Sequence, residues 1–318
     1  MTRRLLLGAA WPTALVERLS AALEGWEIIL WSDVGADERK TADVVVPAAA
    51  IIDRALLEGS RIRLVHQFGV GLDTVDLAAA KDLGVMVANT PSVLSGGAVA
   101  VAEGALLLVL MCARLRTQQE RFLAEQRWNW QVPLNLGLAG RTAGLVGFGN
   151  IGREIAKRLL AFDMTVRAVR RSGDPAGEAA TLGIASIETM DALGDMLAAS
   201  DVVVICTPLN DGTRNLFDAK MLARMKPGAI LVNVGRGGIV DEAALVAALD
   251  SGALHAAGLD TIAVEPAPLD SPLLAHDRIV VTPHDAGVSD KAFDGIAAML
   301  KENMRRLEAG EDLLHRAV

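Results

Sequence analysis

The chain has few cysteines and none of the residue spacings that mark a metal site. Its two cysteines, Cys112 and Cys206, lie in apolar runs of the 318-residue sequence. A free cysteine behaves as a small hydrophobic residue, so we expect both to be buried and not to form a disulfide. Neither CxxC nor HExxH occurs, and the five histidines are scattered. The sequence therefore predicts no disulfide and no metal site.

Positive charge is also scarce, and so are long hydrophobic runs. The formal net charge of −8 leaves no basic surplus for nucleic acid or an anionic membrane. No apolar run approaches the roughly 20 residues that span a bilayer. The start of the chain superficially resembles a signal peptide, but its apolar run is short and Pro12 leads into the amphipathic stretch Thr13–Leu23. We therefore expect a cytoplasmic protein that binds neither nucleic acid nor a membrane.

What the sequence does contain is typical of a folded α/β protein. Hydrophobic residues make up 52% and charged residues 22%, which is a globular composition, and 318 residues suggest two domains. Short β-rich runs alternate with helical patterns, which predicts parallel sheets with crossover helices. The expected strands are Leu5–Gly8, Ile28–Trp31, Val44–Val46, Leu64–Gln67, Val85–Ala88, Ala143–Gly147, Met164–Val169, Asp201–Cys206, Ala229–Asn233, His255–Gly258 and Arg278–Val281.

One of the helical patterns is long and strongly apolar. It runs from about Ala98 to Ala113 and contains a single charge, Glu103, which predicts a helix that is buried on most sides. An irregular, aromatic segment at Arg121–Leu138 follows it. The other expected helices are Thr13–Leu23, Arg54–Glu58, Val75–Lys81, Ile151–Phe162 and Lys291–Ala309.

A glycine motif lies between an expected strand and an expected helix. It reads Gly147-Phe148-Gly149-Asn150-Ile151-Gly152. The first glycine allows a tight strand-to-helix turn, the second lets the backbone approach a pyrophosphate, and the third permits close helix–strand packing. The pyrophosphate then rests on the positive N-terminus of the helix. Although a lone GxGxxG is weak in a chain with 30 glycines, this context predicts a Rossmann dinucleotide site.

A basic turn follows the next strand. Eighteen residues past the last glycine, where an acidic residue would bind the ribose 2′-OH of NAD, the chain reads Arg170-Arg171-Ser172. Arginine accepts no hydrogen bond, but its fork matches a phosphate. These residues favour NADP(H), which carries a 2′-phosphate, and leave NAD(H) open. The alternative interpretation is a solvated basic turn without a ligand.

Three more polar segments follow strands of the second half. They contain Arg236, Glu265 and His284, and the carboxyl ends of parallel strands converge on the crevice where ligands bind. There the arginine could clamp a substrate carboxylate, the histidine could shuttle a carbonyl proton, and the glutamate could tune the histidine. Taken singly, each residue could instead be an ordinary loop residue; the ordered set favours a site.

The chain resembles the D-isomer-specific 2-hydroxyacid dehydrogenases, a family that includes glyoxylate and hydroxypyruvate reductases and phosphoglycerate dehydrogenase. The similarity covers nearly the full length. It is carried by the glycine motif and by Gly69–Asp76, Asn89–Pro91, Val101–Glu103, Thr207–Leu209, Asn233–Gly237, Asp260–Pro266 and Thr282–His284.

The resemblance implies a role for each matching residue. Arg236 would bind the substrate carboxylate and polarise the keto oxygen. His284 would be the general acid in reduction and the base in oxidation, and Glu265 would pair with it and raise its pKa. Formate dehydrogenases of the superfamily have glutamine in place of Glu265, so the chain does not follow them. The remaining implied contacts are those of Asp260 with the nicotinamide carboxamide, of Thr207 and Pro208 with the cofactor, and of the Val70 and Gly71 amides with the substrate carboxylate.

The resemblance also implies the architecture. We expect two Rossmann-like, doubly wound parallel-sheet domains of the α/β class with a cleft between them. Residues 1–93 and 286–318 would form a flavodoxin-like substrate-binding domain, and residues 94–285 the dinucleotide-binding domain. The latter would include a dimerisation helix and arm at about 98–138, which predicts a homodimer. Trp128 and Trp130 in this arm would either reach the partner's active site or anchor the interface.

The predicted reaction is NADPH-dependent reduction of a small 2-keto acid, glyoxylate or hydroxypyruvate, to the D-2-hydroxy acid. Phosphoglycerate dehydrogenase or another 2-hydroxyacid dehydrogenase is the alternative. It is weakened because Val46–Ala50 lacks the arginines that some phosphoglycerate enzymes carry there. A dinucleotide-sensing regulator similar to corepressors of this fold is a third possibility. Asp285, which follows His284 where relatives carry an apolar residue, has no assigned role.

Overall fold

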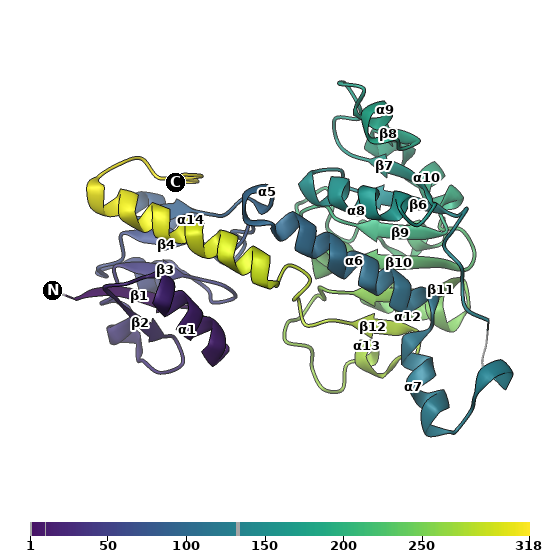
Figure 1. Ribbon diagram of the computed structural model, residues 1–318, viewed down its shortest axis with the longest axis horizontal. Helices are drawn as coiled ribbons and strands as arrows, with labels where there is room; N and C mark the ends of the chain where they lie inside the picture. Colours follow the sequence, from purple (N-terminus) through teal and green to yellow (C-terminus); the bar gives the residue numbers. More distant parts are fainter. Residues whose placement is uncertain (1, 10, 132–133) are drawn as a thin grey trace. The chain divides into compact units, whose positions relative to one another are not determined.

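The computed structural model describes residues 2–9, 11–131 and 134–318, and their contacts divide the chain into two units (Figure 1). Met1–Gly97 with Ser289–Val318 forms unit 1, and Ala98–Val288 forms unit 2. The boundaries expected from the sequence lie at 93/94 and 285/286. Each unit contains one parallel sheet with helices on both faces, which confirms the predicted α/β class.

The sheet of unit 1 has five parallel strands in the order β2-β1-β3-β4-β5, the order of flavodoxin-like folds. Leu5 and Leu7 of β1 pack into one apolar cluster with α1 and α14, while Leu6 packs into a second cluster with α3 and α4. The strands are β1 Arg3–Leu7, β2 Trp26–Leu30, β3 Val44–Val46, β4 Leu64–His66 and β5 Met86–Ala88; the helices are α1 Thr13–Ala22, α2 Ala36–Arg39, α3 Arg54–Leu57, α4 Leu77–Asp82, α5 Ser92–Ser95 and α14 Asp290–Ala309.

The sheet of unit 2 has seven parallel strands in the order β12-β11-β10-β9-β6-β7-β8. After β6 the chain adds β7 and β8 on one side, then returns to place β9 to β12 on the other, so the order reverses between β6 and β9. In such a doubly wound sheet, ligands bind outside the carboxyl ends of the strands at this switch point. The strands are β6 Thr142–Val146, β7 Thr165–Val169, β8 Ser186–Glu188, β9 Val202–Ile205, β10 Ala229–Asn233, β11 Leu254–Leu259 and β12 Ile279–Val281.

Helices cover both faces of this sheet because its strands are apolar on both sides. Residues of α6 and α8 pack with Leu145 and Val204 on one face, and residues of α10 and α12 pack with Val203 and Leu231 on the other. The helices of unit 2 are α6 Gly97–Ala113, α7 Arg116–Ala124, α8 Asn150–Leu160, α9 Glu178–Leu182, α10 Leu193–Ala199, α11 Ala219–Leu222, α12 Glu242–Asp250 and α13 Pro272–Ala275, with 3₁₀ turns η1 Asn129–Gln131, η2 Met190–Ala192 and η3 Gly237–Ile239.

The long helix agrees with the expectation, and the segment after it differs in part. Helix α6 is buried or half-buried except for one exposed stripe of Val99, Glu103 and Leu107 at helical spacing, which confirms that it is buried on most sides. The interpretation of Arg121–Leu138 as wholly irregular is wrong, because α7 extends through Ala124. The side chain of Trp130 and residues 132 and 133 lie outside the described part of the chain, whereas the Trp128 side chain is exposed.

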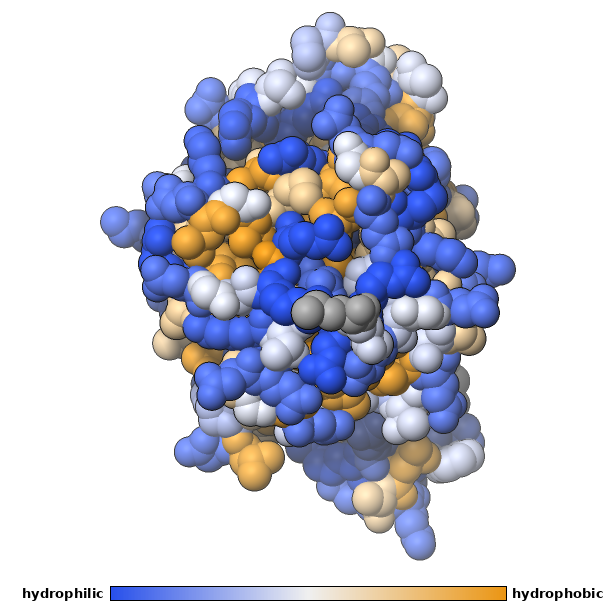
Figure 2. Space-filling view, turned by 90° about the vertical axis from the view of Figure 1, so that its left-hand side faces the viewer, coloured by the Kyte–Doolittle hydropathy of each residue, from blue (hydrophilic) through white to orange (hydrophobic). Residues whose placement is uncertain are grey.

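Hydrophilic side chains dominate the face seen in Figure 2, with smaller apolar areas between them. Within the described ranges, no single helix is long and apolar enough to cross a membrane; α6 and α7 meet that criterion only as a pair, and they are bent by 51° at their junction.

Candidate active site

Two glycines of the motif after β6 are required by close backbone packing. Gly147 has a φ of +98°, and a Cβ there would lie 2.9 Å from the carbonyl oxygen of Cys206. A Cβ on Gly152 would lie 2.9 Å from the carbonyl oxygen of Gly147. Any side chain at either position would force apart β6, β9 and α8. The observed geometry therefore gives both glycines the roles expected from the motif.

The middle glycine faces open space instead. A Cβ on Gly149 would meet no heavy atom within 4 Å. Gly149 also caps α8, an 11-residue helix beginning at Asn150 and Ile151, and has no side chain to accept the N–H groups of the first turn. An open cradle before these donors and the positive helix end fits the pyrophosphate of a dinucleotide.

The end of β9 lies against this glycine loop. The Cys206 thiol donates a hydrogen bond to the carbonyl oxygen of Gly147 over 3.0 Å. Burial raises the pKa of this thiol to about 12, so it remains a protonated donor. The carbonyl of the next residue, Thr207, approaches Gly235, where a Cβ would lie only 2.7 Å away from it. Thr207 and Pro208, predicted to bind the cofactor, thus follow the strand beside the glycine loop.

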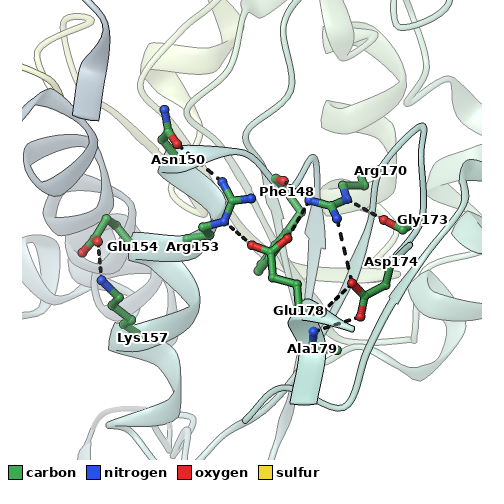
Figure 3. A network of polar contacts seen from close by, with 10 residues as sticks. All are labelled: Phe148, Asn150, Arg153, Glu154, Lys157, Arg170, Gly173, Asp174, Glu178 and Ala179. Atoms are coloured by element: carbon green, nitrogen blue, oxygen red, sulfur yellow. Dashed lines mark hydrogen bonds and ion pairs between the residues drawn. The ribbon is translucent and has the colours of Figure 1, made fainter. Parts of the chain in front are cut away.

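The basic turn after β7 is less open than its sequence suggests. The Arg170 side chain is only 17% exposed, and its Nη1 donates to Glu178 Oε2 over 2.9 Å (Figure 3). Arg171 and Ser172 are exposed. The residue that sequence reasoning missed is Glu178, eight positions further on. A carboxylate so soon after a basic turn was the available signal, but only the path of the turn brings it back to Arg170.

Arg236 lies in a turn that Asn233, the last residue of β10, holds in place. Asn233 Oδ1 accepts from the Gly235 amide over 3.0 Å, and Asn233 Nδ2 donates to the Arg236 carbonyl over 2.9 Å. Arg236 Nη1 donates to the Gly235 carbonyl over 2.8 Å. The next residue, Gly237, packs so closely that a Cβ would lie 1.9 Å from the carbonyl carbon of Ile262. The arginine turn therefore sits directly against the loop that follows β11.

That loop presents Glu265 to His284. The ring Nδ1 of His284 lies 2.7 Å from Glu265 Oε2, and since a carboxylate only accepts, Nδ1 carries the proton. Glu265 Oε1 accepts from the Ile262 amide over 3.0 Å, which fixes the carboxylate. Glu242 Oε1 in turn accepts from the Ala263 amide over 2.6 Å. The pairing predicted for Glu265 and His284 is present in the structure.

Asp260 anchors the segment that carries His284. Its Oδ1 accepts from Thr282 Oγ1 over 2.7 Å and from the amides of Asp285 and Ala286 over 3.0 and 3.1 Å. These bonds bracket His284, whose φ of +55° is uncommon for a residue with a side chain. Asp260 is nearly fully buried and the Asp285 side chain is exposed. The sequence indicated Asp260 only as a contact of the nicotinamide carboxamide, and its bonds around His284 appear only in the fold.

Val70 and Gly71 belong to unit 1, where they follow β4. The Val70 carbonyl accepts from Asn89 Nδ2 over 2.7 Å, and the Thr90 amide donates to the Gly69 carbonyl over 2.8 Å. These bonds tie the turn to the segment after β5.

No group of metal-ligating side chains occurs among the residues that the structure describes.

Comparison with known proteins identifies the family. Residues 106–286 match the model of the "D-isomer specific 2-hydroxyacid dehydrogenase, NAD binding domain". A hydroxypyruvate reductase from Thermotoga maritima is 38% identical over 265 residues, which are 82% of this chain and 83% of that protein. The chain belongs to this family of oxidoreductases.

Other members differ in length and in the reaction they are named for. A D-3-phosphoglycerate dehydrogenase from Mycobacterium bovis is 37% identical over 92% of this chain, but the match spans only 55% of that protein. A solved structure of an NADPH-dependent glyoxylate/hydroxypyruvate reductase from Sinorhizobium meliloti, in complex with NADP and malonate, superposes with a TM-score of 0.81. It is 30% identical and the match covers 100% of this chain and 97% of that one. A nicotinamide dinucleotide is thus the cofactor class of this family.

Proposed function

We propose that the protein reduces a small 2-keto acid of the glyoxylate/hydroxypyruvate class to the D-2-hydroxy acid, and catalyses the reverse oxidation. The observation that carries the proposal is the 2.7 Å contact between His284 and Glu265, beside the turn that holds Arg236. All three residues follow carboxyl ends of the same parallel sheet as the glycine motif. An arginine, an oriented histidine and a dinucleotide cradle at one sheet edge suit carbonyl reduction.

The proposed mechanism assigns one task to each residue. The Arg236 guanidinium binds the substrate carboxylate and polarises the keto oxygen, which a bidentate donor does well. His284 delivers the proton from Nε2 to the carbonyl oxygen and takes it back in the oxidation. Glu265 holds the ring through Nδ1 and stabilises the imidazolium. When bound, a reduced nicotinamide supplies the hydride; contacts of Asp260 with its carboxamide, and of Val70 and Gly71 with the substrate, remain predictions.

For the cofactor, we propose NADP(H) over NAD(H). Arg170, Arg171 and Ser172 stand after β7, where the ribose of a dinucleotide lies in Rossmann domains, and none of them is acidic. The similar S. meliloti reductase is named as NADPH-dependent. The contact between Arg170 and Glu178 weakens the preference for NADP(H), so NAD(H) stays the alternative cofactor.

Phosphoglycerate dehydrogenase is the second candidate function, because several relatives carry that name. Val46–Ala50, which begins at the last residue of β3, has no base to meet a substrate phosphate.

A homodimer and a cytoplasmic location also remain proposals. The exposed apolar side chains Leu107, Leu123 and Trp128 on and after α6 support the dimer.

Steady-state kinetics on purified protein tests the proposed reaction. Glyoxylate, hydroxypyruvate, pyruvate and phosphohydroxypyruvate are each assayed with NADPH and with NADH. We expect one of the first two to give the highest kcat/KM, and His284→Gln to lower kcat by about 10²–10⁴-fold, the usual contribution of a general acid. His276→Gln is the matched control, since His276 also contacts a carboxylate, Asp250, at 3.3 Å. Near-wild-type turnover by His284→Gln would refute the mechanism, and a preference for phosphohydroxypyruvate would refute the substrate class.

A further inference from the structure

Four charged side chains form a network at the end of β7, beside the glycine motif (Figure 3): those of Arg153, Arg170, Asp174 and Glu178. Glu178 bridges two arginines: Oε1 accepts from Arg153 Nε, in the first turns of α8, and Oε2 accepts from Arg170 Nη1 over 2.9 Å. Arg170 also donates from Nε to the Gly173 carbonyl over 2.5 Å and from Nη1 to the Phe148 carbonyl over 3.3 Å. Most of the guanidinium fork is therefore already engaged within the chain.

The bridge is partly withdrawn from solvent. The Arg170 and Glu178 side chains are 17% and 19% exposed. Hydrogen bonds from Arg153 and then from Arg170 hold the pKa of Glu178 below its usual range, so the carboxylate is ionised at neutral pH. A charge-assisted contact with limited water access is stronger than an exposed ion pair. Glu178 thus neutralises much of the positive charge that the sequence places here.

Asp174 supports this arrangement without replacing it. Its Oδ1 and Oδ2 accept from the amides of Glu178 and Ala179 over 2.7 and 2.9 Å, which starts α9. The nearest Arg170 nitrogen is 4.0 Å from Asp174, at the limit of an ion pair. Asp174 therefore fixes the backbone of Glu178, and Glu178 makes the direct contact with Arg170.

We propose that Glu178 is a specificity-determining residue, whose carboxylate competes with the 2′-phosphate of NADP(H) for the Arg170 guanidinium. The inference rests on the proposed function, in which Arg170 is the base that meets this phosphate. A 2′-phosphate must displace the carboxylate from Arg170 or bind beside a like charge, whereas the 2′-OH of NAD(H) meets neither cost. Glu178 thereby reduces the difference in affinity between NADP(H) and NAD(H).

The test measures binding of two nucleotides that differ only in the 2′-phosphate. Adenosine 2′,5′-bisphosphate and adenosine 5′-monophosphate are titrated calorimetrically into wild type, Glu178→Gln and Glu154→Gln. Glu154 is the matched control, because it also contacts two basic residues, Lys157 and Arg158, but points to another side of α8 (Figure 3). We expect Glu178→Gln to lower the Kd of the bisphosphate by about tenfold, the effect of one charge-assisted hydrogen bond, with the monophosphate unchanged.

Further variants separate this role from a structural one. In the Arg170→Gln background, Glu178→Gln should have a smaller effect, because the guanidinium that it frees is gone. Glu178→Ala should reproduce the effect of Glu178→Gln if the carboxylate is what matters. Weaker or unchanged bisphosphate binding by both Glu178 variants would overturn the proposal, as would equal tightening of both nucleotides or the same tightening in Glu154→Gln.

Failure of the proposed function is distinguishable from failure of this inference. If no 2-keto acid is turned over but the bisphosphate binds more tightly to Glu178→Gln, the proposed reaction is wrong and the role of Glu178 stands. If turnover is as proposed and the NADPH-to-NADH ratio of kcat/KM does not rise in Glu178→Gln, only the role of Glu178 is wrong. A wild type that turns over no 2-keto acid and binds neither nucleotide would overturn both.

Discussion

Acidification should destabilise unit 1 through a single buried histidine, His66, the last residue of β4. Its side chain is 0% exposed, and neither ring nitrogen makes a hydrogen bond of normal geometry to the residues that the structure describes. Burial lowers the pKa of His66 to about 4, only partly opposed by the nearby backbone of His66 and Gln67. Protonation of a buried ring whose nitrogens lack hydrogen-bond partners costs free energy, because the charged form loses its hydration.

The sign and size follow from proton linkage. An unfolded histidine titrates near 6.5, so between the two pKa values the unfolded chain binds more protons than the folded one. The contribution of His66 to stability is therefore present above pH 6.5 and is lost as the pH falls toward 4. Between pH 7 and pH 5 we expect His66 to lower the free energy of unfolding of unit 1 by about 2 kcal/mol.

Native-state hydrogen exchange measures this for unit 1 alone. The slowest amides of β1 and β4 are followed at pH 7 and pH 5, in wild type and in His66→Leu, whose side chain cannot titrate. Carboxylates contribute equally to both proteins, so the difference in pH dependence isolates His66. Equal losses of protection in the two proteins, or titration of the His66 ring near 6.5 by NMR, would refute the reasoning.

Two further predictions concern unit 2. Asp260→Ala removes the acceptor of Thr282 Oγ1 and of two amides beside His284, so kcat should fall at least about tenfold. The control Asp250→Ala should leave kcat unchanged. An unaltered kcat of Asp260→Ala in steady-state assays would show that the segment around His284 keeps its conformation without these bonds. Leu107→Glu puts a charge on the exposed stripe of α6, so the expected homodimer should dissociate in size-exclusion chromatography with light scattering, whereas Leu269→Glu, at a fully exposed loop position, should not change the mass. A monomeric wild type would contradict the dimer prediction itself.

Strands of the buried sheets are the elements best predicted from the sequence. Val44–Val46 and Ala229–Asn233 are predicted with their observed bounds, because a short apolar run bounded by turn residues is typical of a fully buried strand of a parallel sheet. Strand Ser186–Glu188 is absent from the prediction. It lies at the edge of its sheet and only its middle residue is buried, so its pattern does not distinguish it from a loop.

The candidate site was predicted as a set of residues with one contact among them, that of Glu265 with His284. Arg236, Glu265 and His284 could be grouped because parallel strands deliver their carboxyl ends to one edge. The three bonds of Asp260 could not be predicted, since they depend on the register of β11 against β12. The start of the aromatic segment Arg121–Leu138 was predicted as irregular although it is helical, because helix α7 is stabilised by the buried Phe122 and has no strong local pattern.

The sequence by itself determined the cofactor class and identified candidates for the reacting groups, because a glycine motif and the residue types at strand ends depend only on backbone geometry and side-chain chemistry. Only the tertiary structure decided how much of that chemistry is available to a ligand. In the sequence the basic turn at Arg170 has no adjacent acidic residue, but the fold brings Glu178 Oε2 to 2.9 Å from Arg170 Nη1. Charges act through distance and burial, and neither quantity can be read from the order of residues.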